Sequence, residues 1–163
     1  MDILLQELTA GLPEGRDLEL VILRLSAAAI LGMAIGIERQ RAGKAAGVRT
    51  HMLVTVGTTA FVMAVLMHGM TADGLSRVIQ GIVTGIGFIG AGTIIKHDSA
   101  ADVKGLTTSA GIWISAAIGV AIGMGLLGLA AMVTLLTLII LTVTVAVDNW
   151  LNQGRITKKV HKH

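Results

Sequence analysis

The sequence predicts an all-α integral membrane protein, a single domain built as a bundle of about five transmembrane helices. Composition is the first observation behind this prediction: 53% of the 163 residues are hydrophobic and 14% are charged, against about 25% charged in a soluble domain. The second is a mean hydropathy of +0.79. The third is that five apolar stretches approach the roughly 20 residues that a helix needs to cross the hydrocarbon core.

The five apolar stretches predict the membrane spans in order. They cover about residues 18–37, 52–67, 78–95, 106–123 and 126–147, and a short basic tail follows at 148–163. The last stretch is rich in β-branched residues, which would favour a strand in water. A lone strand in lipid leaves its backbone amides unpaired, so a helix is expected there as well. A four-span bundle with one short stretch re-entrant is the alternative.

The segment before the first span is acidic and carries no basic start typical of a signal peptide. Residues 3–12 are too short to span and are expected to form an interfacial helix that ends near Pro13. Orientation follows from the loops, because cytoplasmic loops are enriched in lysine and arginine. Ten of the 13 basic residues lie in three segments that alternate onto one side: Arg39, Arg41, Lys44, Arg49; Lys96, Lys104; Arg155, Lys158, Lys159, Lys162. The N-terminus is therefore expected outside and the C-terminus in the cytoplasm.

Composition and spacing also argue against several functions. Aromatic residues make up 2% of the chain, so platforms for base stacking are lacking and no nucleic-acid partner is expected. The basic pI near 9.7 instead fits loops beside an anionic lipid surface. The five histidines do not occur at metal-ligand spacing, and no nucleophile–base pair stands out. The sequence therefore predicts a protein that is not an enzyme, with no cofactor and no metal site.

Small residues recur at every fourth position in three of the predicted spans. These stripes are Ala28, Gly32 and Gly36; Gly81 and Gly85; and Gly111, Ser115, Gly119 and Gly123. In lipid, this spacing lets two helix backbones approach closely. The stripes indicate packing between helices of one chain or, alternatively, a homo-oligomer interface.

The third predicted span contains a dense run of glycines. Gly85, Gly87 and Gly90 formally match a dinucleotide-binding pattern, but the preceding strand and the βαβ unit that this pattern requires are not predicted. With Gly92, the run indicates either tight helix packing or a locally unwound helix whose freed carbonyls line a polar site.

Arg24 lies too far inside the first span to be moved out of the membrane. A span that began after it would keep only about 13 residues, or roughly 20 Å of helix. The side chain is expected either to extend to the outer surface or to pair inside the bundle. The candidate partners are Asp73, a hydroxyl group or a glycine carbonyl.

Other charged residues lie where spans meet the membrane surface. Glu38 ends the first span, and it is expected either in a solvated turn or paired with Arg49 across the helix ends. Arg77 and Gln80 begin the third span, where Asp73 is placed to form a local ion pair with Arg77.

Hydroxyl groups open the fourth predicted span. Thr107 and Thr108, followed by Ser109, are expected to cap the helix. Binding of an anion at the positive end of this helix is the alternative.

Three ordered motifs resemble the MgtC/SapB family of bacterial inner-membrane proteins. They are Arg24-Leu25 through Gly36-Ile37-Glu38-Arg39 with Gly43-Lys44-Ala45-Ala46-Gly47-Val48-Arg49-Thr50-His51; Ser76-Arg77-Val78-Ile79-Gln80 with Gly85-Ile86-Gly87-Phe88-Ile89-Gly90-Ala91-Gly92; and Lys104-Gly105-Leu106-Thr107-Thr108-Ser109-Ala110-Gly111-Ile112-Trp113. The resemblance covers about residues 20–125. It implies a small multi-pass protein linked to growth at low magnesium and, in pathogens, to virulence, in a short form without the soluble C-terminal domain of longer members.

Two function classes follow from this resemblance. The first is a regulatory protein that binds another membrane complex, and the second is a small homo-oligomeric transporter or channel for Mg²⁺ or another cation. Mg²⁺ prefers oxygen ligands that usually include carboxylates, yet no carboxylate lies within spans two to five. The expected partners are membrane lipids, a second copy or another membrane complex, and, for the transporter, Mg²⁺.

Overall fold

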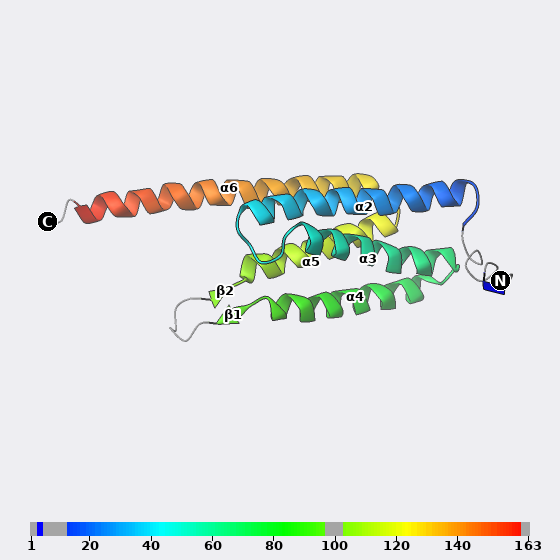
Figure 1. The fold of residues 1–163 in the computed structure, drawn as a ribbon. Coiled ribbons are helices and arrows are strands. Elements are labelled where there is room, and N and C mark those ends of the chain that lie inside the picture. Colours follow the sequence, from blue (N-terminus) through cyan, green and yellow to red (C-terminus); the bar gives the residue numbers. More distant parts are fainter. Residues whose placement is uncertain (1–2, 5–12, 97–102, 161–163) are drawn as a thin grey trace.

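The computed structural model describes residues 3–4, 13–96 and 103–160, with side chains described up to residue 144 apart from those of residues 95 and 96 (Figure 1). Five long helices run up and down along one axis: α2 (Arg16–Arg41), α3 (Val48–Met67), α4 (Ala72–Gly92), α5 (Leu106–Gly123) and α6 (Leu127–Val160). Between α4 and α5 the two-residue strands β1 (Ile95–Lys96) and β2 (Val103–Lys104) pair antiparallel. Residues 5–12 of the expected interfacial helix lie outside the described residues.

All five helices are long and apolar enough to cross a membrane, α6 through its segment Leu127–Thr144. The predicted fold class, an all-helical multi-pass membrane protein with five spanning helices, is confirmed. The start of α2 and the end of α6 lie at opposite ends of the bundle (Figure 1). Helix α6 continues through most of the predicted tail and ends at Val160.

Helix α4 starts six residues earlier than its predicted span and ends at Gly92. Thr71 explains the early start: its hydroxyl oxygen accepts from the Gly74 amide at 3.4 Å, which caps the first turn. The helix is continuous from Ala72 to Gly92. The alternative of a locally unwound glycine segment was therefore wrong.

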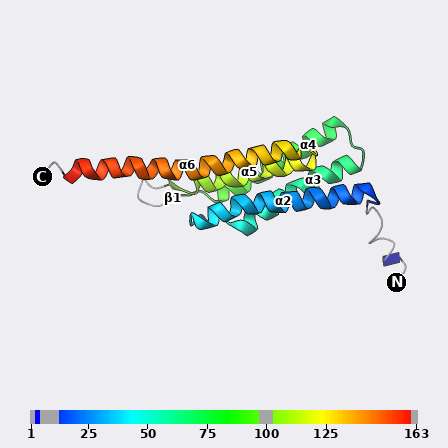
Figure 2. The ribbon, with the colours of Figure 1, turned by 90° about the horizontal axis from the view of Figure 1, so that it is seen from above.

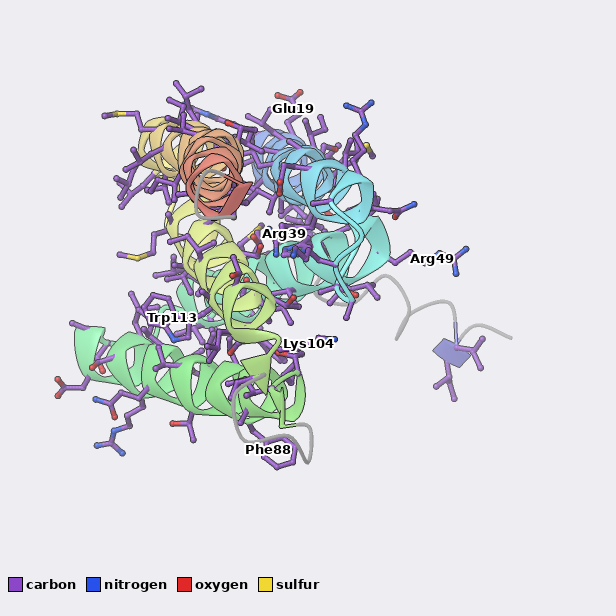
Figure 3. The ribbon with its side chains drawn as sticks, turned by 90° about the vertical axis from the view of Figure 1, so that its left-hand side faces the viewer. Glu19, Arg39, Arg49, Phe88, Lys104 and Trp113 are labelled. Carbon is purple, nitrogen blue, oxygen red and sulfur yellow. The ribbon has the colours of Figure 1, made fainter. Side chains whose placement is uncertain are left out.

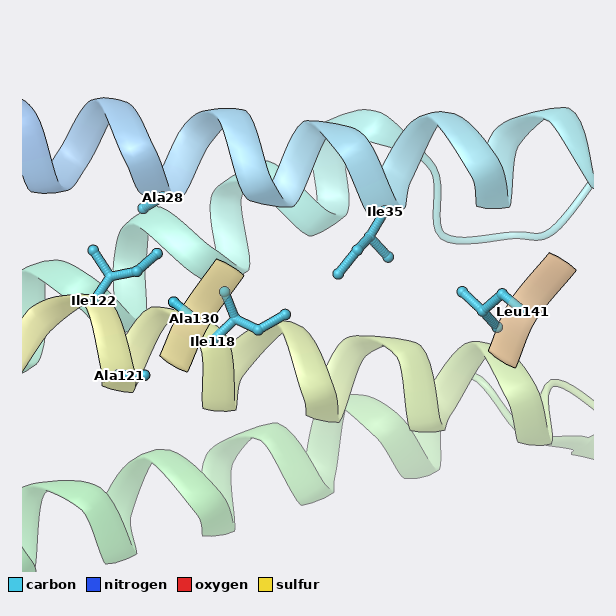
Figure 4. Close-up of a cluster of buried hydrophobic side chains, with 7 residues drawn as sticks. All are labelled: Ala28, Ile35, Ile118, Ala121, Ile122, Ala130 and Leu141. Atoms are coloured by element: carbon cyan, nitrogen blue, oxygen red, sulfur yellow. The ribbon is translucent and has the colours of Figure 1, made fainter. Parts of the chain in front are cut away.

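Helix α3 packs against both α2 and α5, and α6 covers α2 and α5 (Figure 1 and Figure 2). Helix α4 packs mainly on α5 and lies at the edge of the bundle. A buried apolar cluster joins α2, α5 and α6 (Figure 4); its members are Ala28, Ile35, Ile118, Ala121, Ile122, Ala130 and Leu141. Lipid tails are as apolar as the side chains, so no hydrophobic force drives the helices together. Dispersion contacts in such clusters stabilise their association instead.

The stripes in α2 and α5 bring these two helices onto α3. A methyl group added to Gly32 would lie 2.8 Å from the His51 carbonyl oxygen, and one added to Gly36 would lie 2.5 Å from Val48 Cα. On α5, a methyl group on Gly123 would lie 2.6 Å from Val62 Cβ. These glycines therefore pack within one chain, as the favoured interpretation expected.

The glycines of α4 do not share this role. A methyl group added to Gly81, Gly85, Gly87 or Gly92 would meet nothing within 4 Å. Within the glycine run, only Gly90 is closely packed, with its added methyl 2.6 Å from Ser109 Oγ on α5. The expected tight packing of the glycine run holds at one position, and the other glycines are exposed.

Candidate functional site

A buried polar cluster lies where the last turn of α2 and the first turn of α3 meet α5. Its members are Glu38 and Arg39 of α2, His51 of α3 and Ser115 of α5. A cation in the last turn of a helix is stabilised by the negative end of the helix dipole, which favours arginine at position 39. The cluster thus collects ionisable and polar groups at one end of an otherwise apolar bundle.

The His51 ring is fully buried and is held by α5. Its Nδ1 lies 2.8 Å from Ser115 Oγ, and the Ser115 hydroxyl donates to the Gly111 carbonyl at 3.0 Å. With that hydroxyl proton directed to Gly111, Oγ accepts from the Nδ1–H of the imidazole. Gly111 also leaves room for the ring, because a methyl group there would lie 3.4 Å from His51 Cε1.

Arg39 is 2% exposed, although it carries a full charge. Its Nη1 lies 3.6 Å from Glu38 Oε2, which makes an ion pair longer than a hydrogen bond. Four buried atoms of the cluster have no hydrogen-bond partner: Glu38 Oε2, Arg39 Nε, Arg39 Nη2 and His51 Nε2. Figure 3 looks onto this end of the bundle and shows Arg39 between the helices.

Hydroxyl groups of α3 link it to both neighbours below this cluster. The Thr55 hydroxyl donates to the Ala28 carbonyl of α2 at 2.7 Å. The Thr59 hydroxyl donates to the Gly119 carbonyl of α5 at 2.9 Å. Such bonds between helices stabilise a bundle in lipid and hold α3 in register with α2 and α5.

At the other end of the bundle, Arg24 caps the C-terminus of α5. Its Nη1 donates to the carbonyl of Gly123, the last residue of α5, at 3.0 Å. Of the candidate partners, the structure therefore shows a glycine carbonyl, whereas Asp73 is exposed at the start of α4. The cation also faces the negative end of the α5 dipole.

Replacing Arg24 by methionine is expected to lower the free energy of unfolding by about 1–2 kcal/mol, because a charged hydrogen bond to an otherwise unpaired carbonyl is lost and the site is partly solvated. Thermal unfolding of the detergent-purified protein measures the change. The control is Arg16→Met at the exposed start of the same helix. Equal melting temperatures for the two variants would contradict a capping role for Arg24.

The alternative of an ion pair between Glu38 and Arg49 was wrong, because the partner of Glu38 is Arg39. Arg49 is exposed and points away from the bundle (Figure 3). It lies two residues before His51, and side chains at that spacing leave a helix on nearly opposite faces. Since His51 faces the interior, Arg49 faces outward.

The predicted ion pair between Asp73 and Arg77 was also wrong. Both side chains are exposed, and no ion pair joins them. Gln80 is exposed as well. Because α4 begins at Ala72, Arg77 and Gln80 lie beyond its first turn and are not at its start.

The hydroxyl groups predicted to cap the fourth span do not do so. The residue before α5 is Gly105, in the left-handed region at φ +98°, and no side chain caps the helix. A methyl group on Gly105 would overlap the Thr93 carbonyl oxygen. Thr107 is exposed and Thr108 is buried, both within the first turn. The close crossing of the chain at Thr93 thus sets the start of α5.

Sequence reasoning identified Glu38 as a candidate but missed the rest of the polar cluster. In the sequence, Arg39 is recognisable only as a basic loop residue and Ser115 only as a small packing residue, and His51 is not a candidate. The available signal was the presence of a histidine and a serine inside two apolar spans, because polar atoms in lipid need partners within the protein.

Comparison with known proteins gives one consistent result. Residues 25–150 match the family model described as the MgtC family. The chain is 45% identical over 131 residues to the Escherichia coli K12 protein named "Putative magnesium transporter YhiD", an alignment that covers 75% of this chain and 59% of YhiD. It is 42% identical over 142 residues to SrpB of Synechococcus elongatus, covering 80% of this chain and 78% of SrpB.

A third relative is MgtC of Brucella abortus, which is 46% identical over 111 residues, covering 68% of this chain and 45% of that protein. The chain thus spans about three fifths of YhiD and less than half of this MgtC. No solved structure matches.

Proposed function

Because the chain belongs to the MgtC family, we propose that it serves adaptation to low magnesium in a bacterial inner membrane by binding and regulating another membrane complex. The link to magnesium rests on the family and on the name that YhiD carries. In the proposed orientation, the end with exposed Arg41, Lys44 and Arg49 faces the cytoplasm, in keeping with the basic bias of cytoplasmic loops.

The outward face of α4 is the observation that carries the regulatory proposal. Gly81, Gly85 and Gly92 share one exposed helix face, at spacings of four and seven residues, and no intrachain group lies near their missing side chains. Phe88, 84% exposed, lies on the same face and points away from the bundle (Figure 3). Glycine costs about 1 kcal/mol relative to alanine inside a helix. Close approach of a helix from a partner would offset that cost.

A hollow beside this face extends the surface onto α3. It has a volume of about 430 Å³, and its lining includes Gly81, Gly85 and Ile86 of α4 and the exposed Phe61 of α3. The lining is almost entirely apolar. Its chemistry suits a transmembrane helix of another protein that lies against the glycines and fills the hollow with a side chain.

The charges inside the bundle favour regulation over conduction of Mg²⁺. Among the described side chains, every carboxylate except that of Glu38 is exposed, and Glu38 is paired with Arg39. A buried guanidinium repels a divalent cation, and at low dielectric this repulsion is strong. The interior polar groups are thus better suited to hold the helices and an anion than to ligate Mg²⁺.

Replacing Gly85 by leucine is expected to abolish partner binding and growth at low magnesium without unfolding the protein, because a Cβ added there meets nothing within 4 Å and the rest of the side chain would occupy the apolar hollow. A photo-crosslinking residue at position 92 in living cells measures partner capture, and growth at low magnesium measures function. The matched control is Val83→Leu, at an exposed position of the same helix. Retained capture and growth in Gly85→Leu would contradict the proposal.

The transporter alternative is favoured by the name of YhiD and has its own test. Purified protein in liposomes would be assayed for Mg²⁺ uptake with a fluorescent indicator inside the vesicles. Regulation predicts no uptake above that of empty vesicles. Uptake that Gly85→Leu abolishes, with crosslinks only between copies of this chain, would establish the homo-oligomeric transporter instead.

A further inference from the structure

We propose that Arg39 and His51 form a buried binding site for a phosphate-type oxoanion at the junction of α2, α3 and α5. The inference stands apart from the proposed function, because it holds whether the protein regulates a partner or transports an ion. It rests on unpaired donors inside the protein, on the geometry of one guanidinium edge, and on the charge around the site.

The guanidinium of Arg39 presents one occupied and one vacant edge. Nη1 faces Glu38 Oε2 at 3.6 Å, whereas Nε and Nη2 have no partner. These two nitrogens form the edge whose parallel N–H groups match two oxygens of a carboxylate or phosphate. With Arg39 98% buried, leaving this edge empty would cost the full desolvation of two charged donors.

His51 adds a third unpaired group beside Arg39. Its ring is fully buried, and its Nε2 has no hydrogen-bond partner. Nδ1 is engaged by Ser115, so Nε2 is the ring nitrogen left without a partner. With the ring proton on Nδ1, Nε2 carries a lone pair that can accept from the P–OH group of a protonated phosphate bound to Arg39. The site then offers two donors from Arg39 and one acceptor from His51.

The charge around the cluster favours an anion over a cation. Arginine has no lone pair with which to ligate a metal ion. Exposed Arg41, Lys44 and Arg49 surround the same end of the bundle, and Glu38 is already engaged on the other edge of the guanidinium. Bridging water would satisfy the hydrogen bonds but would not match the parallel pair of N–H groups with two linked oxygens. Inorganic phosphate and a phospholipid headgroup share the chemistry that fits.

Titration of the detergent-purified protein with inorganic phosphate, at ionic strength held constant with sodium chloride, tests the site by thermal shift. A ligand that binds only the folded state raises the melting temperature in a saturable way. We expect phosphate to give such a curve for the wild type and chloride to give none. Arg39→Lys keeps the charge but removes the parallel pair of N–H donors, and it should weaken phosphate binding about tenfold or more. The matched control, Arg41→Lys at an exposed position, should bind like the wild type.

A second variant keeps the test decisive if Arg39→Lys does not fold. His51→Gln preserves a neutral polar group and should weaken binding of radiolabelled phosphate in equilibrium dialysis. Nanodiscs of phosphatidylglycerol or phosphatidylcholine separate a lipid headgroup from free phosphate as the ligand. If a headgroup occupies the site, added phosphate should not raise the melting temperature in phosphatidylglycerol but should still raise it in phosphatidylcholine. Equal stabilisation by chloride and phosphate, or wild-type binding by both variants, would overturn the proposal.

Discussion

Replacing Gly119 by alanine is expected to lower the free energy of unfolding by about 3 kcal/mol, and so to lower the melting temperature by roughly 10 °C. The added methyl would overlap Thr58 Oγ1 and would lie 2.5 Å from the Thr55 carbonyl oxygen on α3. The backbone oxygen cannot move away, because it belongs to the helix at the centre of the bundle. Helix α5 would have to separate from α3, which would also break the bond from Thr59 to the Gly119 carbonyl.

Thermal unfolding in detergent, followed by circular dichroism, measures the loss at Gly119. Gly57→Ala is the matched control, because Gly57 lies within α3 and a methyl group there meets nothing within 4 Å. That control should be neutral or slightly stabilised, since alanine is favoured over glycine by about 1 kcal/mol in a helix. Similar melting temperatures for the two variants would show that α3 and α5 do not meet at Gly119.

Replacing Gly105 by alanine is expected to cost about 3 kcal/mol and to release the first turn of α5 from the end of α4. Two effects add here. The backbone at φ +98° disfavours any residue with a Cβ by about 1–2 kcal/mol. The Cβ would also overlap the Thr93 carbonyl oxygen and would lie 2.8 Å from its carbonyl carbon, so one of the two chain segments must shift.

Amide hydrogen exchange of the intact protein measures this release. The Ser109 amide donates to the Gly105 carbonyl at 2.8 Å, and its protection should fall in Gly105→Ala. Gly43→Ala isolates the backbone effect, because Gly43 has φ +67° and open space around it. The control should lose only about 1 kcal/mol. If both variants lost the same stability, the contact with Thr93 would have no energetic weight.

The sequence alone was sufficient to predict the five spanning helices and the packing role of the glycines in α2 and α5. In lipid, a single apolar segment can pair all of its backbone amides only by forming a helix. Each span could therefore be recognised from its own residues. The stripe in α5 was likewise local: Gly111, Ser115 and Gly119 recur at the helix repeat, whatever helix they contact. Even so, the start of α4 was misplaced, because the cap at Thr71 lies outside the apolar stretch.

Only the tertiary structure decided which polar groups meet. His51 and Ser115 are 64 residues apart, and Arg24 and Gly123 are 99 apart, so their contacts depend on how each helix is rotated about its axis and how far it slides along its neighbour. Hydropathy places a helix in the membrane but determines neither its rotation about its own axis nor its position along its neighbour. Close packing at the glycines removes that freedom, and in doing so it turns Arg39 and His51 inward and Arg49 out.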